Sequence, residues 1–404
     1  MGKVTNYRED PMRHRVFSVV ILLACGLVVS AGAPPSAVAP ATDPDALVVH
    51  EWGTFTSVAG SDGTPVEWVP QIGPRELPCF IERVTFDGKG WLPATVRMET
   101  PVLYFYSSVD RDVDVRVRFR QGVITEWYPR AEVTPRALGP YVLKSPILEG
   151  TIAWKQIKVQ PRGEETYPVE GHSNHYYTAR ETDAAPVVVG NQREKFLFYR
   201  GVGNFALPVA ARIADDGRVG VTPASNQSVA DVMLFENRNG TVTFTPAQPN
   251  GQALTLSMPA AASSREAVYA ALEATLIKHG LYAREAAAMV ETWHDSWFEE
   301  GLRVFYIVPR AAIDDVLPLD VSPAPASVAR VFVGRIELIT PAMVEEVGAA
   351  LRNRDRAPIL KYGRFLRPIV ARLNGITAPP DSAEWNGQMQ FAFSTVAPSA
   401  GGCR

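Results

Sequence analysis

The stretch Arg111-Asp112-Val113-Asp114-Val115-Arg116-Val117-Arg118-Phe119-Arg120 alternates charged and apolar residues along its length. Successive side chains of a β-strand point to opposite faces, so this period of two predicts a strand with one buried and one solvated face. The turn residues Gln121-Gly122 and the segment 123–128 predict a partner strand in a hairpin. We expect the arginine row to be a solvated face, although it could also grip an acidic polysaccharide or a phosphate.

Strand patterns of this kind recur from Val48 to about Pro259. The segment 102–106 is apolar on both faces, as in a central strand, and Asn239-Gly240 between two apolar runs is a strong hairpin signal. Many short strands with turns at regular spacing favour an antiparallel β-sandwich. The sequence therefore predicts a β-rich N-terminal region, built as one large sandwich or as two units divided near residue 186.

Helical patterns appear after Ser263, where Ser263-Ser264-Arg265-Glu266 resembles a capping box. Strands at about 302–308 and 328–339 interrupt the helices, so we expect an α+β C-terminal domain, either separate from the sandwich or capping it. The expected organisation divides the chain into a signal peptide at 1–31, a Pro/Ala-rich tether at 32–47, a β-sandwich region at 48–259, an α+β domain at 260–378 and a C-terminal tail at 379–404.

The N-terminus indicates export. Arg13 and Arg15 precede an apolar run at 16–29, and small residues follow, with a cleavage site expected after Ala31. In an alternative interpretation, Cys25 is acylated and anchors a lipoprotein. We expect an exported protein, periplasmic, at the cell surface or secreted, whose contact with a membrane is limited to such an anchor.

The net charge and the absence of certain motifs argue against some classes of function. The formal net charge is −3, which gives no general attraction to nucleic acid. The glycine-rich loops that bind nucleotide phosphates are absent from the sequence, so nucleotide cofactors are not indicated. After removal of the signal peptide only Cys79 and Cys403 remain, and they could form a disulfide in an oxidising compartment.

The stretch 170–183 is the strongest candidate site, because it combines two of the six histidines with tyrosines, an arginine and three carboxylates. A bend at Ser173-Asn174 would let His172 and His175 converge on one metal ion, Zn²⁺ or another divalent metal. The third ligand is open, and the candidates that we considered are Asp183, Glu181, Glu170, His50 and Glu51.

In a metal-dependent hydrolase, Arg180 would stabilise developing negative charge and Glu181 would serve as a further catalytic carboxylate. A nucleophilic Ser173 is disfavoured, because His175 replaces the glycine that closes a nucleophile elbow, and because Tyr176-Tyr177-Thr178 is typical of a strand. A second cluster, 293–300, contains a histidine among carboxylates, and we interpret it mainly as an amphipathic helix that docks two tryptophans.

The segments Val49-His50-Glu51-Trp52-Gly53-Thr54-Phe55-Thr56, Met98-Glu99-Thr100-Pro101-Val102 and Phe198-Tyr199-Arg200-Gly201-Val202-Gly203 resemble those of a group of exported bacterial proteins without an assigned activity. The resemblance implies a bacterial, exported setting, and it supplies no catalytic residues that could be carried over to this chain. Two hypotheses follow. The first is a non-catalytic binding or scaffold protein for glycan or another envelope protein, and the second is a metal-dependent hydrolase centred on His172 and His175.

Overall fold

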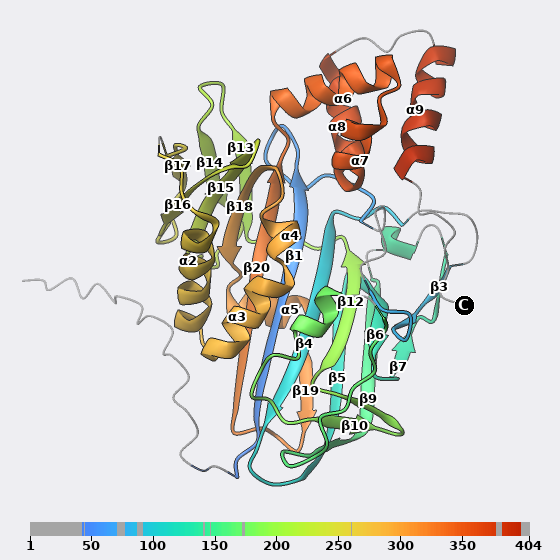
Figure 1. The fold of residues 1–404 in the computed structure, drawn as a ribbon, viewed down its shortest axis with the longest axis vertical. Helices are drawn as coiled ribbons and strands as arrows, with labels where there is room; N and C mark the ends of the chain where they lie inside the picture. Colours follow the sequence, from blue (N-terminus) through green and yellow to red (C-terminus); the bar gives the residue numbers. More distant parts are fainter. Residues whose placement is uncertain are drawn as a thin grey trace, which may run out of the picture. The chain divides into compact units, whose positions relative to one another are not determined.

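Two β-sheets stack face to face, and helices cover the outer face of the larger sheet (Figure 1). The computed structural model describes residues 43, 45–70, 77–86, 92–139, 142–145, 147–171, 174–259, 261–376 and 382–396, which belong to one compact unit. The expected signal peptide, Cys25, most of the tether and Cys403 lie outside these residues.

The larger sheet has nine strands. In spatial order they are β16 (Thr241–Ala247), β15 (Val232–Arg238), β18 (Gly301–Ile307), β20 (Ser327–Leu338), β1 (Val48–Ala59), β4 (Val96–Tyr106), β12 (Leu197–Gly203), β6 (Gly122–Tyr128) and β2 (Glu82–Arg83). β18 and β20 come from the region expected to form an α+β domain, so the expected boundary at residue 260 runs through one continuous sheet. The sheet is mixed rather than purely antiparallel, because β1 and β20 are parallel.

The smaller sheet is antiparallel and has six strands. They are β11 (Gln192–Glu194), β10 (Val187–Val189), β9 (Glu149–Val159), β5 (Arg111–Arg120), β19 (Leu319–Ser322) and β7 (Glu132–Thr134). The predicted strand 111–120 is confirmed as β5, and its valines and Phe119 are buried. Its predicted hairpin with 123–128 is wrong. β5 pairs with β9 and β19, whereas β6 joins the larger sheet, so the turn at Gln121 passes the chain from one sheet to the other.

The remaining strands form two small sheets. β13 (Val209–Ile213), β14 (Val219–Pro223) and β17 (Leu254–Leu256) form a three-stranded sheet, and β3 (Thr85–Phe86) pairs with β8 (Ala137–Leu138). The hairpin predicted at Asn239-Gly240 is confirmed by the antiparallel pair β15 and β16. The β-rich N-terminal region and the concentration of helices in the C-terminal part agree with the predicted fold class.

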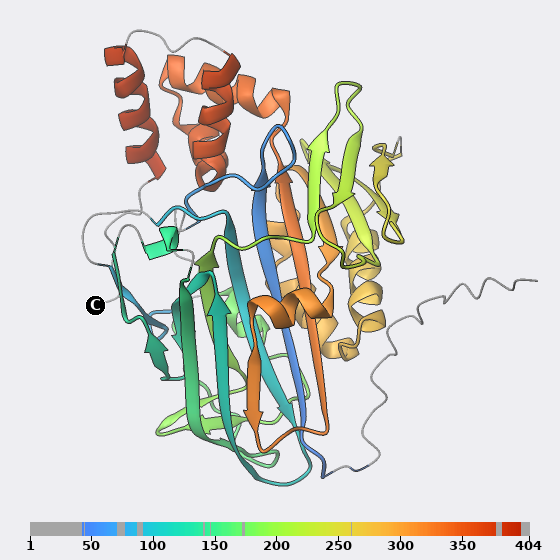
Figure 2. The ribbon, with the colours of Figure 1, turned by 180° about the vertical axis from the view of Figure 1, so that it is seen from behind.

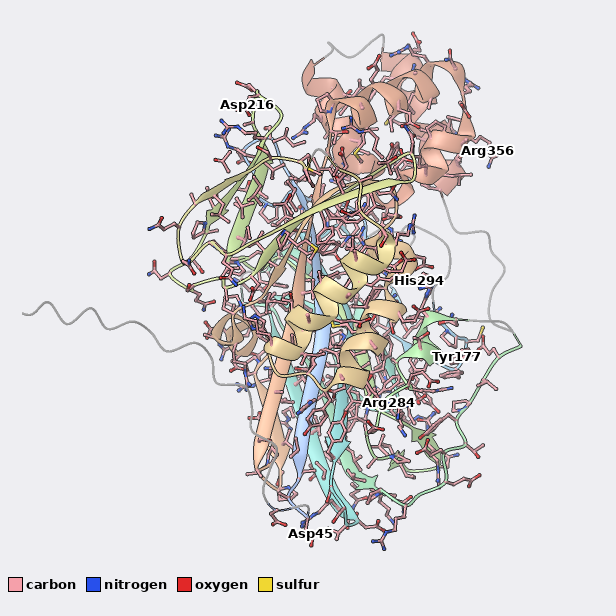
Figure 3. The ribbon with its side chains drawn as sticks, turned by 60° about the vertical axis from the view of Figure 1, so that its left-hand side comes forward. Asp45, Tyr177, Asp216, Arg284, His294 and Arg356 are labelled. Carbon is pink, nitrogen blue, oxygen red and sulfur yellow. The ribbon has the colours of Figure 1, made fainter. Side chains whose placement is uncertain are left out.

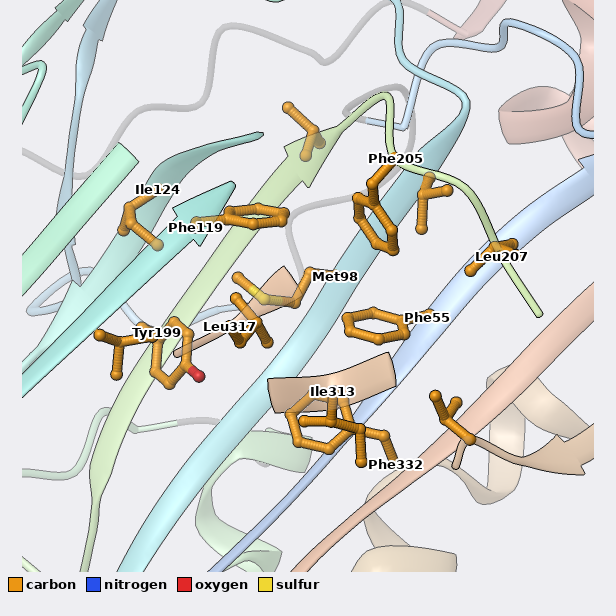
Figure 4. Close-up of a cluster of buried hydrophobic side chains, with 14 of the residues drawn as sticks. Phe55, Met98, Phe119, Ile124, Tyr199, Phe205, Leu207, Ile313, Leu317 and Phe332 are labelled. Carbon is orange, nitrogen blue, oxygen red and sulfur yellow. The ribbon is translucent and has the colours of Figure 1, made fainter. Parts of the chain in front are cut away.

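The main hydrophobic core lies between the two sheets. Phe55 and Phe332 from the larger sheet meet Phe119 from the smaller one, with Phe205 packed between them (Figure 4). The short helix α5 (Arg310–Val316), drawn in orange in Figure 2, adds Ile313 to this core. Each large apolar side chain fully buried here contributes on the order of 1.5–3 kcal/mol to the free energy of folding.

A second core lies on the opposite face of the larger sheet, under α1 (His175–Thr178), α2 (Arg265–Lys278), α3 (Ala283–Thr292) and α4 (His294–Trp297). The sequence pattern predicts one helix over 283–300, but the helical run is broken at Trp293. Trp293 and Trp297 nevertheless stack nearly parallel, with ring centroids 6.3 Å apart, and both are buried against the sheet. The expected docking of two tryptophans is therefore confirmed.

The last helices form a third core at one end of the larger sheet (Figure 1). They are α6 (Pro341–Asn353), α7 (Arg356–Lys361), α8 (Leu366–Ile376) and α9 (Ser382–Val396), with the 3₁₀ turn η2 (Gly363–Phe365) between α7 and α8. Residues 382–396, which fall in the expected C-terminal tail, form α9, and its Ala392 and Val396 are buried in the third core. Among the described residues, no helix is both long and apolar enough to cross a membrane.

Cys79 is disulfide-bonded, in agreement with an oxidising compartment. The pairing with Cys403 stays a prediction, because Cys403 lies outside the described residues.

A buried ion pair joins the two central strands. Glu51 on β1 lies directly opposite Arg330 on β20, and the Arg330 Nε donates to Glu51 Oε2 at 2.5 Å, with both side chains fully buried. The Tyr199 hydroxyl on β12 donates to Glu51 Oε1 at 2.5 Å. Burial alone would lower the pKa of Arg330, but the charge of Glu51 outweighs it and raises that pKa. Three strands are thus connected by one charged group inside an apolar core.

We expect Arg330→Met alone to lower the free energy of unfolding by about 3–5 kcal/mol, because it leaves Glu51 buried without its cation. The double variant Glu51→Leu with Arg330→Met should lose less than the sum of the two single variants, because two apolar side chains then replace the pair. Urea unfolding followed by circular dichroism measures all three. Purely additive losses would contradict a direct coupling between Glu51 and Arg330.

Candidate binding site

The stretch 170–183 borders two cavities, one through His175 and Tyr176 and the other through Arg180 to Asp183. The first is called here the enclosed cavity and the second the open cleft. Figure 3 shows the region from the side, with Tyr177 on α1, His294 on α4 and Arg284 on α3. The charged residues that form one cluster in the sequence therefore line two different cavities.

The helix α1 begins because the Asn174 Oδ1 accepts a hydrogen bond of 2.9 Å from the backbone N–H of Tyr176. The residues 176–178 are therefore helical, and the expectation of a strand is wrong. The Tyr104 hydroxyl on β4 donates to the carbonyl of Ala179 at 2.6 Å, which holds the end of α1 against the sheet. Asparagine is a strong N-cap residue, so this local signal was present in the sequence.

The enclosed cavity has a volume of about 240 Å³. Its walls come from α1, the α3–α4 junction, the strands β4 and β12, and η2, so segments far apart in the sequence meet there. The polar groups that carry the chemistry are His175, Asp295, Arg200, Arg364, Thr292 and Ser296.

His175 and Asp295 form an ion pair in the wall of this cavity. The His175 Nε2 lies 2.9 Å from Asp295 Oδ2, and the imidazole of His294 lies 6.2 Å from that of His175 between ring centroids. Burial raises the pKa of Asp295, but the hydrogen bond and charge of His175, with a smaller effect of His294, outweigh burial and lower the pKa overall. At neutral pH the carboxylate is therefore ionised and already engaged.

Three polar atoms around the cavity have no hydrogen-bond partner within the described part of the chain: Thr292 Oγ1, Trp293 Nε1 and Ser296 Oγ. Thr292 and Trp293 are only 2% and 5% exposed. A buried polar group without a partner costs about 1–3 kcal/mol, so native proteins rarely leave several together unless a ligand or water satisfies them.

A chain of alternating charges lies beside the enclosed cavity. Glu299, which lines it, accepts a hydrogen bond from Arg335 Nη2 at 2.9 Å, and Glu337 accepts one from Arg335 Nε at 2.5 Å. Glu337 also forms an ion pair with Arg303, whose Nε lies 3.0 Å from Glu337 Oε1. Arg303 and Arg335 are fully buried on the larger sheet. The charges of these two arginines and two glutamates therefore neutralise one another, and the negative charge of Glu299 is balanced inside the cavity wall.

The floor of the cavity carries an irregular backbone. Thr100 has φ +47°, which is unfavourable for a β-branched residue. The register of β4 against both neighbours shifts here, between Trp52 and Thr54 on β1 and between Phe198 and Gly201 on β12. Segments 49–56, 98–102 and 198–203, on β1, β4 and β12, meet at this irregularity.

The open cleft has a volume of about 730 Å³. Its charged side chains are held in ion pairs: Lys195 Nζ lies 2.8 Å from Glu165 Oε1, and Arg284 Nη1 lies 2.5 Å from Asp183 Oδ1. Hydroxyl and aromatic groups complete the lining, contributed by Tyr106, Ser107, Ser108, Tyr167 and Thr182. The cleft thus presents alternating donors and acceptors rather than one sign of charge.

Arg180 is a structural anchor of the cleft. It donates to both oxygens of Glu194, at 2.8 Å from Nε and 2.6 Å from Nη2, and its Nη2 also donates to the carbonyl of Pro168 at 2.9 Å. The guanidinium faces the rings of Tyr167 and Tyr177 at 5.1 and 4.9 Å. Burial raises the pKa of Glu194, and Arg180 only partly offsets this effect. The Arg180 guanidinium is therefore held in a fixed position at the wall.

His50 lies in a buried cluster with Glu285 and does not meet His175. Its Nδ1 is 2.8 Å from Glu285 Oε2, and the Tyr106 hydroxyl donates to Glu285 Oε1 at 2.8 Å. His50 and Glu285 are 1% and 0% exposed, and the ring of Tyr282 covers the imidazole at 4.4 Å. This cluster fastens α3 to β1 and β4.

The predicted metal ligands do not come together among the described residues. His50 binds Glu285, His175 binds Asp295 and Asp183 binds Arg284, and no group of three His, Cys, Asp or Glu side chains in the described ranges could hold a metal ion. His172 lies outside the described residues. Of the predicted catalytic pair, Arg180 is anchored to Glu194, and Glu181 is an exposed residue of the open cleft.

Sequence reasoning identified some residues of the enclosed cavity and missed others. Asp295 stands in the cluster 293–300, which was interpreted mainly as a docking helix. Arg200, Arg364 and Thr292 were missed, because each is isolated in the sequence. Only the threonine before a proline at Thr100-Pro101, inside an apolar strand, gave a local signal of irregular backbone.

Comparison with known proteins does not assign this chain to a family. No protein-family model matches the chain, and a search of curated proteins finds no match.

The His175–Asp295 pair predicts how the Asp295 carboxyl titrates. His175→Ala should raise the pKa of Asp295, because the burial that opposes ionisation remains while its main cation is lost. His294→Ala should raise that pKa less. A lowered pKa stabilises the fold above the ordinary carboxyl value near pH 4, and this stabilisation is lost as the pH falls through the lowered value. Carbon-13 NMR of the side-chain carboxyl measures the shift, and an unchanged pKa in His175→Ala would contradict the pairing.

Proposed function

We propose that this protein is an exported, non-catalytic binding protein of the cell envelope, and that its open cleft holds a glycan. The observation that carries the proposal is the lining of the cleft, in which Lys195, Arg284 and Arg180 are fixed by the carboxylates of Glu165, Asp183 and Glu194. The buried side chains of Arg180 and Lys195 are therefore ordered before a ligand binds, so their loss of side-chain entropy on binding is small.

The chemistry of the lining suits sugar hydroxyls. Each hydroxyl both donates and accepts, and the cleft offers carboxylate acceptors, ammonium and guanidinium donors, and the hydroxyls of Ser107 and Ser108. Tyr106 and Tyr167 add apolar surface. The volume of about 730 Å³ lies within the range of about 300–1,000 Å³ typical of small-ligand sites. The expected export signal and the disulfide-bonded Cys79 support a location where envelope glycans are found.

Binding of soluble oligosaccharides of two to six sugar units, drawn from bacterial envelope glycans, tests the proposal by isothermal titration calorimetry. We expect Arg284→Ala and Lys195→Ala each to weaken the binding of the preferred oligosaccharide about tenfold, which corresponds to about 1.4 kcal/mol. Arg218→Ala is the matched control, because Arg218 is an exposed arginine that pairs with Asp216 in a surface turn. Binding that is unchanged in both cleft variants, or absent for all oligosaccharides, would contradict the proposal.

The alternative function, a metal-dependent hydrolase centred on His172 and His175, stays a prediction. Its predicted ligand His175 forms an ion pair with Asp295, and no three His, Cys, Asp or Glu side chains among the described residues could hold a metal ion. Elemental analysis of untagged protein decides the matter. The hydrolase hypothesis requires about one equivalent of a divalent metal, lost in His172→Ala and His175→Ala, and metal-free protein would contradict it.

A further inference from the structure

We propose that a third cavity, between α2 and the larger sheet, binds a small uncharged molecule whose surface is mainly apolar, such as one with an aromatic ring or a short hydrocarbon chain. This cavity is called here the apolar pocket. It is separate from the open cleft and from the enclosed cavity, since none of its lining residues lines either of them. The inference rests on the apolar walls of the pocket, on its size and on the partners of its polar side chains.

Side chains of the second core form the walls. Three neighbouring strands and α2 supply them: Met233 from β15, Phe305 and Ile307 from β18, Val333 from β20 and Leu272 from α2. Each of these side chains is at most 7% exposed. A molecule in the pocket therefore meets hydrocarbon and aromatic groups, which favour the removal of apolar surface from water. The flexible thioether of Met233 can adapt to the shape of the ligand.

The polar side chains at the rim bind one another. The Lys278 Nζ donates to both carboxylate oxygens of Asp231 at 2.9 Å, and the His279 Nε2 lies 2.6 Å from Asp231 Oδ2. The Gln248 Nε2 donates to Asp231 Oδ1 at 3.3 Å. Burial raises the pKa of Asp231, but the hydrogen bonds of His279 and Lys278 outweigh it and lower the pKa overall. The Asp231 charge is therefore compensated at the rim and does not require a charged ligand.

The two hydroxyl-bearing residues of the lining do not offer a free hydroxyl to a ligand. The Thr275 Oγ1 donates to the carbonyl of Ala271, one turn earlier in α2, at 2.8 Å. The ring of Tyr306 belongs to the main core on the opposite face of the sheet, where it packs over Gly334. Among the described residues, the pocket thus exposes no buried polar side chain that lacks a partner, and a polar ligand would lose water without gaining hydrogen bonds.

The end of α2 is fastened to the sheet, so the pocket is formed before a ligand arrives. Leu272 and Thr275 lie three residues apart on one face of α2, and the same face leads to His279, the C-cap residue. His279 and Lys278 are tied to Asp231, which directly precedes β15. Because these contacts set the distance between helix and sheet, a ligand does not have to order the walls, and this lowers the cost of binding.

Size limits the ligand. The volume of about 430 Å³ lies within the range of about 300–1,000 Å³ typical of small-ligand sites. It corresponds to about fourteen water molecules at about 30 Å³ each. Covalently bonded atoms pack more closely than water, so the pocket suits a molecule of roughly ten to eighteen non-hydrogen atoms.

Fluorescence titration of the purified protein with N-phenyl-1-naphthylamine, an uncharged aromatic probe whose emission rises in apolar surroundings, tests the inference. We expect saturable binding with a Kd of roughly 1–100 μM. Competition with p-cresol and with 1-octanol separates recognition of an aromatic ring from recognition of a hydrocarbon chain. Octanoate should compete less well than 1-octanol, because its charge would enter the apolar pocket without a partner.

Variants of α2 locate the binding. Thr275→Leu places a larger side chain in the pocket and should weaken probe binding at least tenfold. Ala274→Leu is the matched control, because it adds the same side chain to the exposed face of the same helix. Thr275→Val keeps the shape of threonine without its hydroxyl and should leave binding unchanged. If unfolding temperatures show that Thr275→Leu fails to fold, Thr275→Met fills the pocket with a more flexible side chain and takes its place.

Four results would overturn the inference: the probe does not bind saturably below about 1 mM, the folded Thr275→Leu binds like the wild type, Thr275→Val loses binding, or octanoate competes better than 1-octanol, which would make a charged group at the rim part of the recognition. Arg284→Ala in the open cleft should leave probe binding unchanged, and Thr275→Leu should leave glycan binding unchanged. Failure of this inference and failure of the proposed glycan binding are therefore distinguishable.

Discussion

The parallel pairing of β1 with β20 is the constraint on which the rest of the structure depends. Twelve residue pairs align the two strands, and Glu51 meets Arg330 directly across them in the apolar core. A shift of one residue would turn every side chain of one strand to the other face and would separate these charges. The ion pair therefore fixes the register of the two strands that bring the chain's early and late parts into one sheet.

Because this register is fixed, both faces of the larger sheet acquire defined roles. One face carries Phe55 and Phe332 into the core between the sheets. The other carries Trp52 and Val333 under the helices α1 to α4, and further along the same strands it carries Arg335 and Glu337. Arg335 and Glu337 lie between two apolar cores, where the helix pair α3–α4 ends and the C-terminal helices begin. Such a boundary is a natural place for a cavity, since neither core fills it.

The two cavities differ in what they offer a ligand. The open cleft presents both signs of charge, fixed by ion pairs with Asp183, Glu165 and Glu194. The enclosed cavity presents arginines and polar atoms, such as Trp293 Nε1, that have no hydrogen-bond partner within the described part of the chain. The short helix α1 contributes to the enclosed cavity and leads into the cleft, so the stretch 170–183 is important for a different reason than a shared metal ion. It contributes side chains to the walls of two neighbouring cavities.

Much of the secondary structure follows from the sequence alone. The period of two in 111–120, the Asn239-Gly240 turn and the apolar stripe of 265–278 are local signals, and each reports a real element. The broad class, β-rich with helices in the C-terminal part, follows from these signals as well. Strand partners did not follow, because pairing depends on contacts between residues such as Glu51 and Arg330, which are 279 positions apart. Thus β6 does not pair with β5, its expected partner. β20, which lies after the expected domain boundary, belongs to the same sheet as the N-terminal strands.

The same division applies to the sites. The sequence by itself identified the residue types of 170–183 and 293–300 as chemically rich, because histidines and carboxylates stand out by composition. Only the tertiary structure decided which of them meet, pairing His175 with Asp295 and taking His50 to Glu285. It also brought Arg200 and Arg364 to one cavity from strands and turns whose local sequences carry no sign of it. The physical reason is that a binding site is defined by directions and distances across the fold, and these are set by long-range packing.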